Sequence, residues 1–180
     1  MKTTGVIGAG SWGTALATFL SGKGGSVKIW DIDEKHLRSM EENRENVDYL
    51  PGVPLDENIE IAYTVEEALA DADVVLFSAP AQHFRSALTS ALGHIKDDAL
   101  IINVAKGIEQ KTLLRMSQIA ADHIDMDRYV VLSGPSHAEE VGRRLPTTVA
   151  AASYNIKAAE KVQDLFMTDR FRVYTTEDVV

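Results

Sequence analysis

The 180-residue chain contains no cysteine, which excludes disulfide bonds and thiolate metal ligands. It also lacks any run of about 18 apolar residues, so we expect no membrane-spanning helix. The N-terminal residues lack the apolar core of a signal peptide, and we therefore expect a cytoplasmic protein. None of the five histidines has H-x-x-x-H or H-E-x-x-H spacing, and we predict no metal site.

Basic residues are in deficit. The chain has 18 Lys and Arg against 27 Asp and Glu, for a net charge of −9. Contact with a phosphate backbone requires a basic surface, so we expect no binding to nucleic acid. The excess of acid is interpreted as an aid to solubility. The content of 45% hydrophobic and 25% charged residues is ordinary for a globular domain, and this length predicts one domain.

Short apolar strands alternate with segments of helical spacing. The predicted strands are residues 5–8, 27–30, 74–77, 100–104 and 129–132. The predicted helices are residues 11–21, 35–44, 65–70, 83–92 and 112–123. Near-continuous apolar strands separated by helices indicate a parallel sheet with both faces covered. The predicted fold class is therefore α/β, a Rossmann-like doubly wound and mostly parallel sheet.

Two stretches depart from this alternation. After Pro146 we predict a strand (147–153), a helix (156–166) and a strand (171–175), which would add antiparallel strands at the sheet edge near the C-terminus. Residues 46–58, rich in Pro, Gly and Asp, form a long loop that is either functional or merely mobile.

A glycine motif, Gly8-Ala9-Gly10-Ser11-Trp12-Gly13, follows the first strand and opens a helix. In this context G-x-G-x-x-G predicts a dinucleotide-binding loop. Gly8 permits a tight turn, Gly10 lets the backbone approach a pyrophosphate, and Gly13 lets the helix pack against the strand. The helix N-terminus offers free N–H groups to the phosphates. The alternative is a glycine-rich turn that binds no ligand.

Asp31 ends the second strand, 18 residues after Gly13, close to the place of an acid that binds ribose hydroxyls. A carboxylate there repels a 2′-phosphate, so it favours NAD over NADP. The alternative is an acidic N-cap for the next helix, a role that Asp33 serves equally well.

Three further loops lie at the carboxyl ends of predicted strands, where ligands bind in such sheets. Residues 78–83 either lie near the cofactor or form only a turn shaped by Pro80. Lys106 ends another strand, where its amine can pair with a phosphate or polarise a substrate hydroxyl. The alternative for Lys106 is an ordinary solvent-exposed lysine.

The third of these loops is Ser133–Glu140. Gly134 and Ser136 are candidate substrate contacts in it. Ser136 and Glu139 match the S-x-x-E capping box, which predicts that a helix starts here and presents N–H groups to an anion. Ser136 either caps the helix alone or also faces the ligand. His137 is interpreted as a surface or packing residue in the first turn of that helix.

Five segments taken together resemble the bacterial NAD(P)-dependent glycerol-3-phosphate dehydrogenases. They are Gly8–Ala17, Tyr49–Pro51, Lys106–Glu109, Leu132–Val141 and Phe171–Tyr174. The segments occur in order along nearly the whole chain. The resemblance implies hydride transfer between sn-glycerol 3-phosphate and dihydroxyacetone phosphate, with NAD or NADP as cofactor, in the supply of phospholipid precursors.

The resemblance also implies roles for single residues. The cofactor contacts that it implies are Ser11, Trp12, Tyr49, Lys106 and Ala138. The substrate contacts that it implies are Lys106, Gly134 and Ser136. The family continues beyond the strand at 171–174 into a helical domain that carries the general-base lysine. We therefore expect residues 1–180 to be the cofactor-binding domain without that helical domain, and to be inactive alone. A homodimer of the full-length protein is compatible with the resemblance.

One departure concerns the cofactor. Family members often carry a basic or histidine residue just past the second strand, whereas this chain has Asp31-Ile32-Asp33, which favours NAD. Two other functions stay open. A related hydroxy-acid dehydrogenase would share the glycine loop, but the lysine and Gly-Pro-Ser segments argue against it. A non-catalytic NAD-binding sensory module would leave Lys106 without a substrate.

Overall fold

A computed structural model describes residues 2–180, which form a single eight-stranded sheet in the order β3-β2-β1-β4-β5-β6-β7-β8. The strands are β1 (Thr3–Ile7), β2 (Ser26–Trp30), β3 (Ile59–Ile61), β4 (Val74–Phe77), β5 (Leu100–Asn103), β6 (Tyr129–Ser133), β7 (Thr147–Ala152) and β8 (Phe171–Thr176). Strands β1 to β6 are parallel, β7 is antiparallel to β6, and β8 is parallel to β7. The predicted doubly wound sheet with reversed strands at its C-terminal edge is confirmed.

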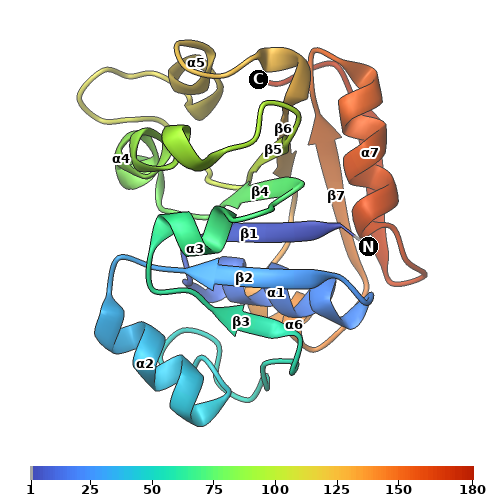
Figure 1. Ribbon diagram of the computed structural model, residues 1–180. Coiled ribbons are helices and arrows are strands. Elements are labelled where there is room, and N and C mark those ends of the chain that lie inside the picture. The colour runs from blue at the N-terminus through green and yellow to red at the C-terminus, as the bar shows by residue number, and fades with distance from the viewer. Residues whose placement is uncertain (1) are drawn as a thin grey trace.

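Helices pack on both faces of this sheet (Figure 1). They are α1 (Ser11–Gly22), α2 (Glu34–Asn43), α3 (Val65–Leu69), α4 (Ala81–Ala91), α5 (Met116–Ala121), α6 (Ala138–Gly142) and α7 (Ile156–Phe166). One apolar core joins α1, α6 and α7 to the sheet through residues such as Leu16, Val141 and Val162. The other core joins α3, α4 and α5 through residues such as Leu69 and Phe84.

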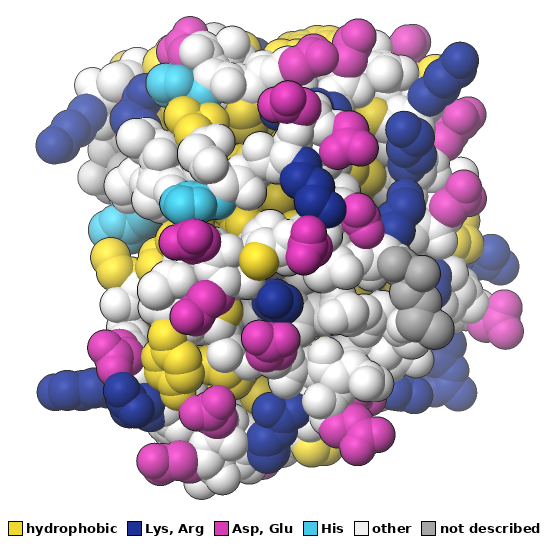
Figure 2. Space-filling view, in the orientation of Figure 1, with side chains coloured by type: hydrophobic (Ala, Val, Ile, Leu, Met, Phe, Trp, Pro, Cys, Tyr) yellow, Lys and Arg dark blue, Asp and Glu magenta, His cyan; other side chains and the backbone are white. Residues whose placement is uncertain are grey.

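The outer surface mixes both signs of charge. Figure 2 shows Asp and Glu side chains interspersed with Lys and Arg over the visible face. Among residues 2–180, no helix combines the length and the apolar character that crossing a bilayer demands.

The helix predicted over residues 112–123 is wrong in its first turn, because α5 begins only at Met116. The preceding residues fold back on themselves instead. The Glu109 N–H donates to the Leu114 carbonyl at 2.8 Å, and the Leu113 N–H donates to the Glu109 carbonyl at 2.8 Å. Leu113 has φ +59°, a left-handed conformation that a right-handed helix does not contain.

The prediction that Ser136 caps a helix is also wrong. Helix α6 begins at Ala138, and its N-cap is His137, which has extended dihedral angles (φ −117°, ψ 140°). Glu139 is therefore the second residue of the helix rather than the third, and no side chain caps α6. The Ser136 hydroxyl donates to the Gly134 carbonyl at 3.4 Å, so it tightens the preceding turn.

The loop predicted at 46–58 is packed against the rest of the chain. Leu50, Val53 and Leu55 are buried in the core beneath α1 and α6, and Asn46 is fully buried. The loop leads into β3, a three-residue edge strand that was not predicted. Strand β3 is too short, with an exposed Glu60 at its centre, to give a clear alternating pattern.

Candidate functional site

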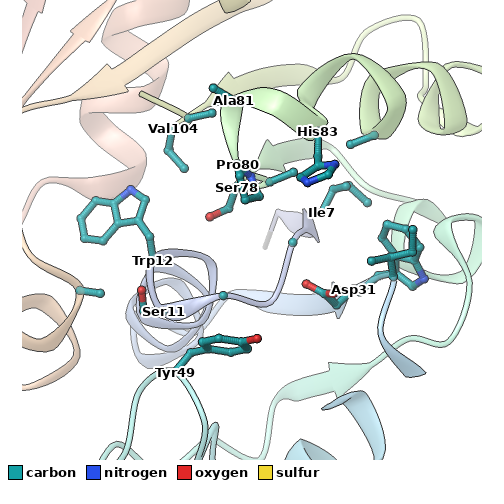
Figure 3. Close-up of a pocket in the computed structure, with 18 of the residues that line it drawn as sticks. Ile7, Ser11, Trp12, Asp31, Tyr49, Ser78, Pro80, Ala81, His83 and Val104 are labelled. Carbon is teal, nitrogen blue, oxygen red and sulfur yellow. The ribbon is translucent and has the colours of Figure 1, made fainter. Parts of the chain in front are cut away.

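A cleft of about 1180 Å³ opens at the carboxyl ends of the central strands. Its floor holds Ile7 at the end of β1, Trp30 at the end of β2, Ser78 just after β4 and Val104 just after β5. The strand order reverses between β1 and β4, and ligands bind at such a reversal in open α/β sheets. Figure 3 shows the cleft, with Trp12 and Asp31 on opposite sides and Tyr49 facing Pro80 and His83 across it.

The three motif glycines have different surroundings. Gly8 has φ +109°, and a Cβ there would lie 2.8 Å from the Ala79 nitrogen. A Cβ on Gly13 would lie 2.0 Å from the Gly8 carbonyl oxygen, so Gly13 sets the close contact of α1 with the strand end. A Cβ on Gly10 would have no protein atom within 4 Å. Gly8 and Gly10 line the cleft, whereas Gly13 lies behind the loop.

The N-terminus of α1 opens onto this cleft. Its N-cap is Gly10, no side chain caps the free N–H groups, and the first turn contains no acidic residue. Ser11 and Trp12 lie at this end and line the cleft. The Trp12 indole nitrogen is buried and has no hydrogen-bond partner among residues 2–180. An uncapped helix N-terminus of this kind favours an anionic group, such as a pyrophosphate.

Asp31 lines the cleft, and its carboxylate holds the glycine loop. It accepts hydrogen bonds from the Ala9 N–H at 2.7 Å and from the Asp33 N–H at 3.1 Å. The N-cap of α2 is Asp33, which accepts from the Lys35 N–H at 3.0 Å. The capping alternative for Asp31 is therefore wrong, and each of its carboxylate oxygens can accept a further hydrogen bond.

The carbonyl of Ala9 joins the glycine loop to the loop that carries Tyr49. Asn46 Nδ2 donates to this carbonyl at 2.8 Å, and His36 Nε2 lies 3.1 Å from it. Asn46 Nδ2 also lies 2.7 Å from the Thr14 hydroxyl, and its Oδ1 accepts from the Tyr49 N–H at 3.0 Å. The Tyr49 ring packs edge-on against His36, with centroids 4.9 Å apart. Tyr49 thereby lines the cleft from the opposite side to β4.

Lys106 and the turn after β6 meet at the other end of the cleft. The Lys106 Nζ donates to the Gly134 carbonyl at 2.8 Å. Gly134 itself packs on β7, where a Cβ would lie 2.9 Å from the Thr148 carbonyl oxygen, and it does not line the cleft. Ser136 and Ala138 do line it. The 78–83 loop lines the cleft as well, and its Gln82 donates to the Ile108 carbonyl, so the structure brings all three candidate loops together.

Several lining residues were missed in the sequence. Ile32 is 88% exposed beside Asp31, and His36 lies beneath Tyr49. Helix α4 contributes Ser86 and Ser90, which lie on one helical face because they are four residues apart. The four-residue spacing of these two serines is visible in the sequence and could have indicated that they share one face of α4. No local pattern marked Ile32 or His36.

Comparison with known proteins assigns the family. Residues 3–159 match the sequence model described as the NAD-dependent glycerol-3-phosphate dehydrogenase N-terminus. The chain belongs to this family. The family and the fold support binding of a nicotinamide cofactor, NAD or NADP.

Curated relatives of this chain are longer and are named as glycerol-3-phosphate dehydrogenases. A glycerol-3-phosphate dehydrogenase [NAD(P)+] of Pelotomaculum thermopropionicum is 51% identical over 178 residues, which cover 97% of this chain and 51% of the relative. The enzyme of that name from Bacillus subtilis strain 168 is 45% identical over 183 residues, 100% of this chain and 53% of the relative. The chain therefore spans about half the length of these dehydrogenases.

A solved structure of this family agrees with the fold. The crystal structure of glycerol-3-phosphate dehydrogenase from Coxiella burnetii superposes with a TM-score of 0.91 at 30% sequence identity, over 99% of this chain and 55% of that one. The sheet order and the reversed strands β7 and β8 are therefore features of a known dehydrogenase architecture.

Proposed function

We propose that residues 1–180 are the cofactor-binding domain of a dehydrogenase that interconverts sn-glycerol 3-phosphate and dihydroxyacetone phosphate, a precursor step for glycerophospholipids. The observation that carries the proposal is the convergence of the glycine loop, Lys106 and Ser136 on one cleft. Relatives 43–51% identical to this chain bear the name of that activity. A helical domain with the general base would complete the site.

The residues of the cleft fit a dinucleotide. The space before Gly10 is free of protein atoms, and the uncapped N–H groups of α1 suit a pyrophosphate. Asp31 would hold the adenosine ribose, with Tyr49 beside it. Ser11, Trp12 and Ala138 would contact the remainder. When bound, the nicotinamide supplies or accepts the hydride.

The substrate would lie between Lys106 and the turn that holds Gly134 and Ser136. The Lys106 ammonium group would orient the substrate oxygen or phosphate by charge, as an exposed cation at the mouth of a cleft can do. Hydride transfer creates or consumes an alkoxide at C2, which requires a proton partner. We assign that partner to the helical domain, so Lys106 is a binding residue here rather than the base.

We expect residues 1–180 to bind NADH at least about tenfold more tightly than NADPH. A 2′-phosphate would meet the carboxylates of Asp31 and Asp33, which both line the cleft, and no lysine or arginine lines the cleft beside them. Fluorescence of Trp12 and Trp30, which line the cleft, provides the titration signal. The D31N variant keeps a hydrogen-bond acceptor for Ala9 and should narrow the ratio, whereas D71N, outside the cleft, should leave it unchanged. Equal affinities, or a preference for NADPH, would show that Asp31 does not select the cofactor.

We also expect this domain alone to reduce dihydroxyacetone phosphate at a negligible rate while it still binds NADH, because the proton partner is assigned to the other domain. The measurement is steady-state oxidation of NADH with dihydroxyacetone phosphate. Turnover near the common enzymatic value of about 10 per second would contradict this division of roles. Protection of Lys106 from amine modification by dihydroxyacetone phosphate separates the enzyme from a sensory module, which has no such substrate.

A further inference from the structure

Helix α4 holds the loop that carries Lys106. Gln82 and Arg85 are three residues apart and therefore lie on neighbouring positions of one helical face. The Gln82 amide binds the loop backbone at two points, because its Nε2 donates to the Ile108 carbonyl at 2.8 Å and its Oε1 accepts from the Gln110 N–H at 2.9 Å. These two backbone groups flank Glu109, so the Gln82 side chain bonds the loop backbone as a neighbouring strand would.

Arg85 binds the side chain between those two points. Its Nε and Nη2 atoms donate to the two carboxylate oxygens of Glu109 at 2.9 and 2.8 Å, a bidentate pair. The Thr112 hydroxyl donates to the same carboxylate. Glu109 is only 8% exposed. The Arg85 hydrogen bonds, followed by that from Thr112, lower the pKa of Glu109 to about 2, so the pair stays ionised across the physiological range.

Apolar burial holds little of the loop between residues 107 and 113. Ile108 and Leu113 are exposed rather than anchored in the core. Gly107 and Leu113 both have positive φ, at +112° and +59°, and the left-handed leucine is strained. Polar contacts therefore hold residues 107–113: the two side chains of α4 and the backbone hydrogen bonds between Glu109 and residues 113–114. Leu114 then packs against the second core.

The loop is anchored upstream as well. The buried Asn103 accepts from the Ala105 N–H at 3.2 Å, which closes a turn directly before Lys106. Lys106 thus lies between the Asn103 turn and the Gln82–Arg85 contacts, and its amine reaches Gly134 across the cleft. A change in either anchor would move this amine.

We propose that Arg85 and Gln82 are positioning residues for Lys106, which clamp residues 107–112 so that the lysine amine is held at the substrate end of the cleft. This inference rests on the proposed function of Lys106. Neither side chain lines the cleft, so each acts through the loop and not by contact with a ligand.

The test compares R85A, R85K and the charge exchange R85E/E109R with R38A. Arg38 is the matched control. Like Arg85, it donates two hydrogen bonds to a glutamate, Glu34, but both residues lie on α2, away from the Lys106 loop. Amide hydrogen exchange of residues 107–114 measures how firmly the loop is held. The rate at which pyridoxal 5′-phosphate modifies Lys106, relative to exposed Lys157, measures the accessibility of the Lys106 amine. Dihydroxyacetone phosphate is the ligand tested for protection of Lys106. ADP-ribose affinity tests the other end of the cleft.

We expect R85A to speed exchange in 107–114 and to raise the half-protecting concentration of dihydroxyacetone phosphate about tenfold. ADP-ribose affinity should change less than about twofold. The effects of R85K should lie between those of R85A and of the unsubstituted chain, since lysine keeps the charge but not the bidentate geometry. The R85E/E109R variant should recover the protection of Lys106. Identical exchange and Lys106 reactivity in R85A and R38A would overturn the inference, as would equal losses for both ligands. If dihydroxyacetone phosphate fails to protect Lys106 in the chain without substitutions, the proposed function is wrong. The amide hydrogen exchange of residues 107–114 still decides the positioning role.

Discussion

Replacing Gly10 by alanine should abolish detectable NADH binding while changing the free energy of unfolding by less than about 0.5 kcal/mol. Gly10 has φ −69° and ψ −174°, a conformation open to alanine, and the new Cβ would touch no protein atom. That Cβ would occupy the space proposed for the pyrophosphate, at the uncapped N-terminus of α1. NADH titration and urea unfolding of the same sample measure the two effects.

Gly13→Ala is the control with the opposite signature. Its Cβ would lie 2.0 Å from the Gly8 carbonyl oxygen, so α1 must move away from the strand end. We expect a loss of about 3 kcal/mol in the free energy of unfolding, together with a loss of binding. Normal NADH affinity in G10A would show that this loop does not hold the pyrophosphate.

Replacing Asn46 by alanine should lower the free energy of unfolding by about 2–3 kcal/mol and weaken NADH binding about tenfold. The amide is fully buried, donates to the Ala9 carbonyl and accepts from the Tyr49 N–H. Its removal leaves buried polar groups without partners and detaches Tyr49 from the glycine loop. Urea unfolding and NADH titration report the two effects.

Asn43→Ala is the matched control for this change. Asn43 is exposed and donates only within its own helical turn, to the Ser39 carbonyl and hydroxyl. We expect N43A to change stability by less than about 0.5 kcal/mol and to leave NADH affinity intact. Equal stability of N46A and N43A would refute the structural role given to Asn46, and unchanged NADH affinity in N46A would refute the link from Tyr49 to the cofactor.

Features that depend on neighbouring residues were readable in the sequence. Apolar runs of four to five residues marked the buried parallel strands, because a strand covered on both faces has no polar side. The spacing from Gly8 to Gly13 and on to Asp31 placed the loop and the acid at adjacent strand ends. The change of pattern after Pro146 predicted strands at β7 and β8, but spacing alone did not fix their direction in the sheet.

Features decided by competition between local preferences were not readable. Residues 112–115 have helical spacing, but hydrogen bonds between Glu109 and residues 113–114 hold them in a loop. Ser136 matches a capping box, yet His137 takes the N-cap position. In both cases, two backbone paths differ by only a few hydrogen bonds, and surroundings distant in sequence select between them.

The sequence by itself determined the longer strands of the sheet, the glycine loop and the acid beside it, because each depends on spacing within a strand–loop–helix unit. Only the tertiary structure decided how the site is held together. Asn46 reaches a carbonyl 37 residues away, Lys106 reaches one 28 residues away, and Arg85 reaches a carboxylate 24 residues away. Contacts between residues so far apart leave no period or motif in the chain, since they form only when the sheet brings its strand ends to one edge.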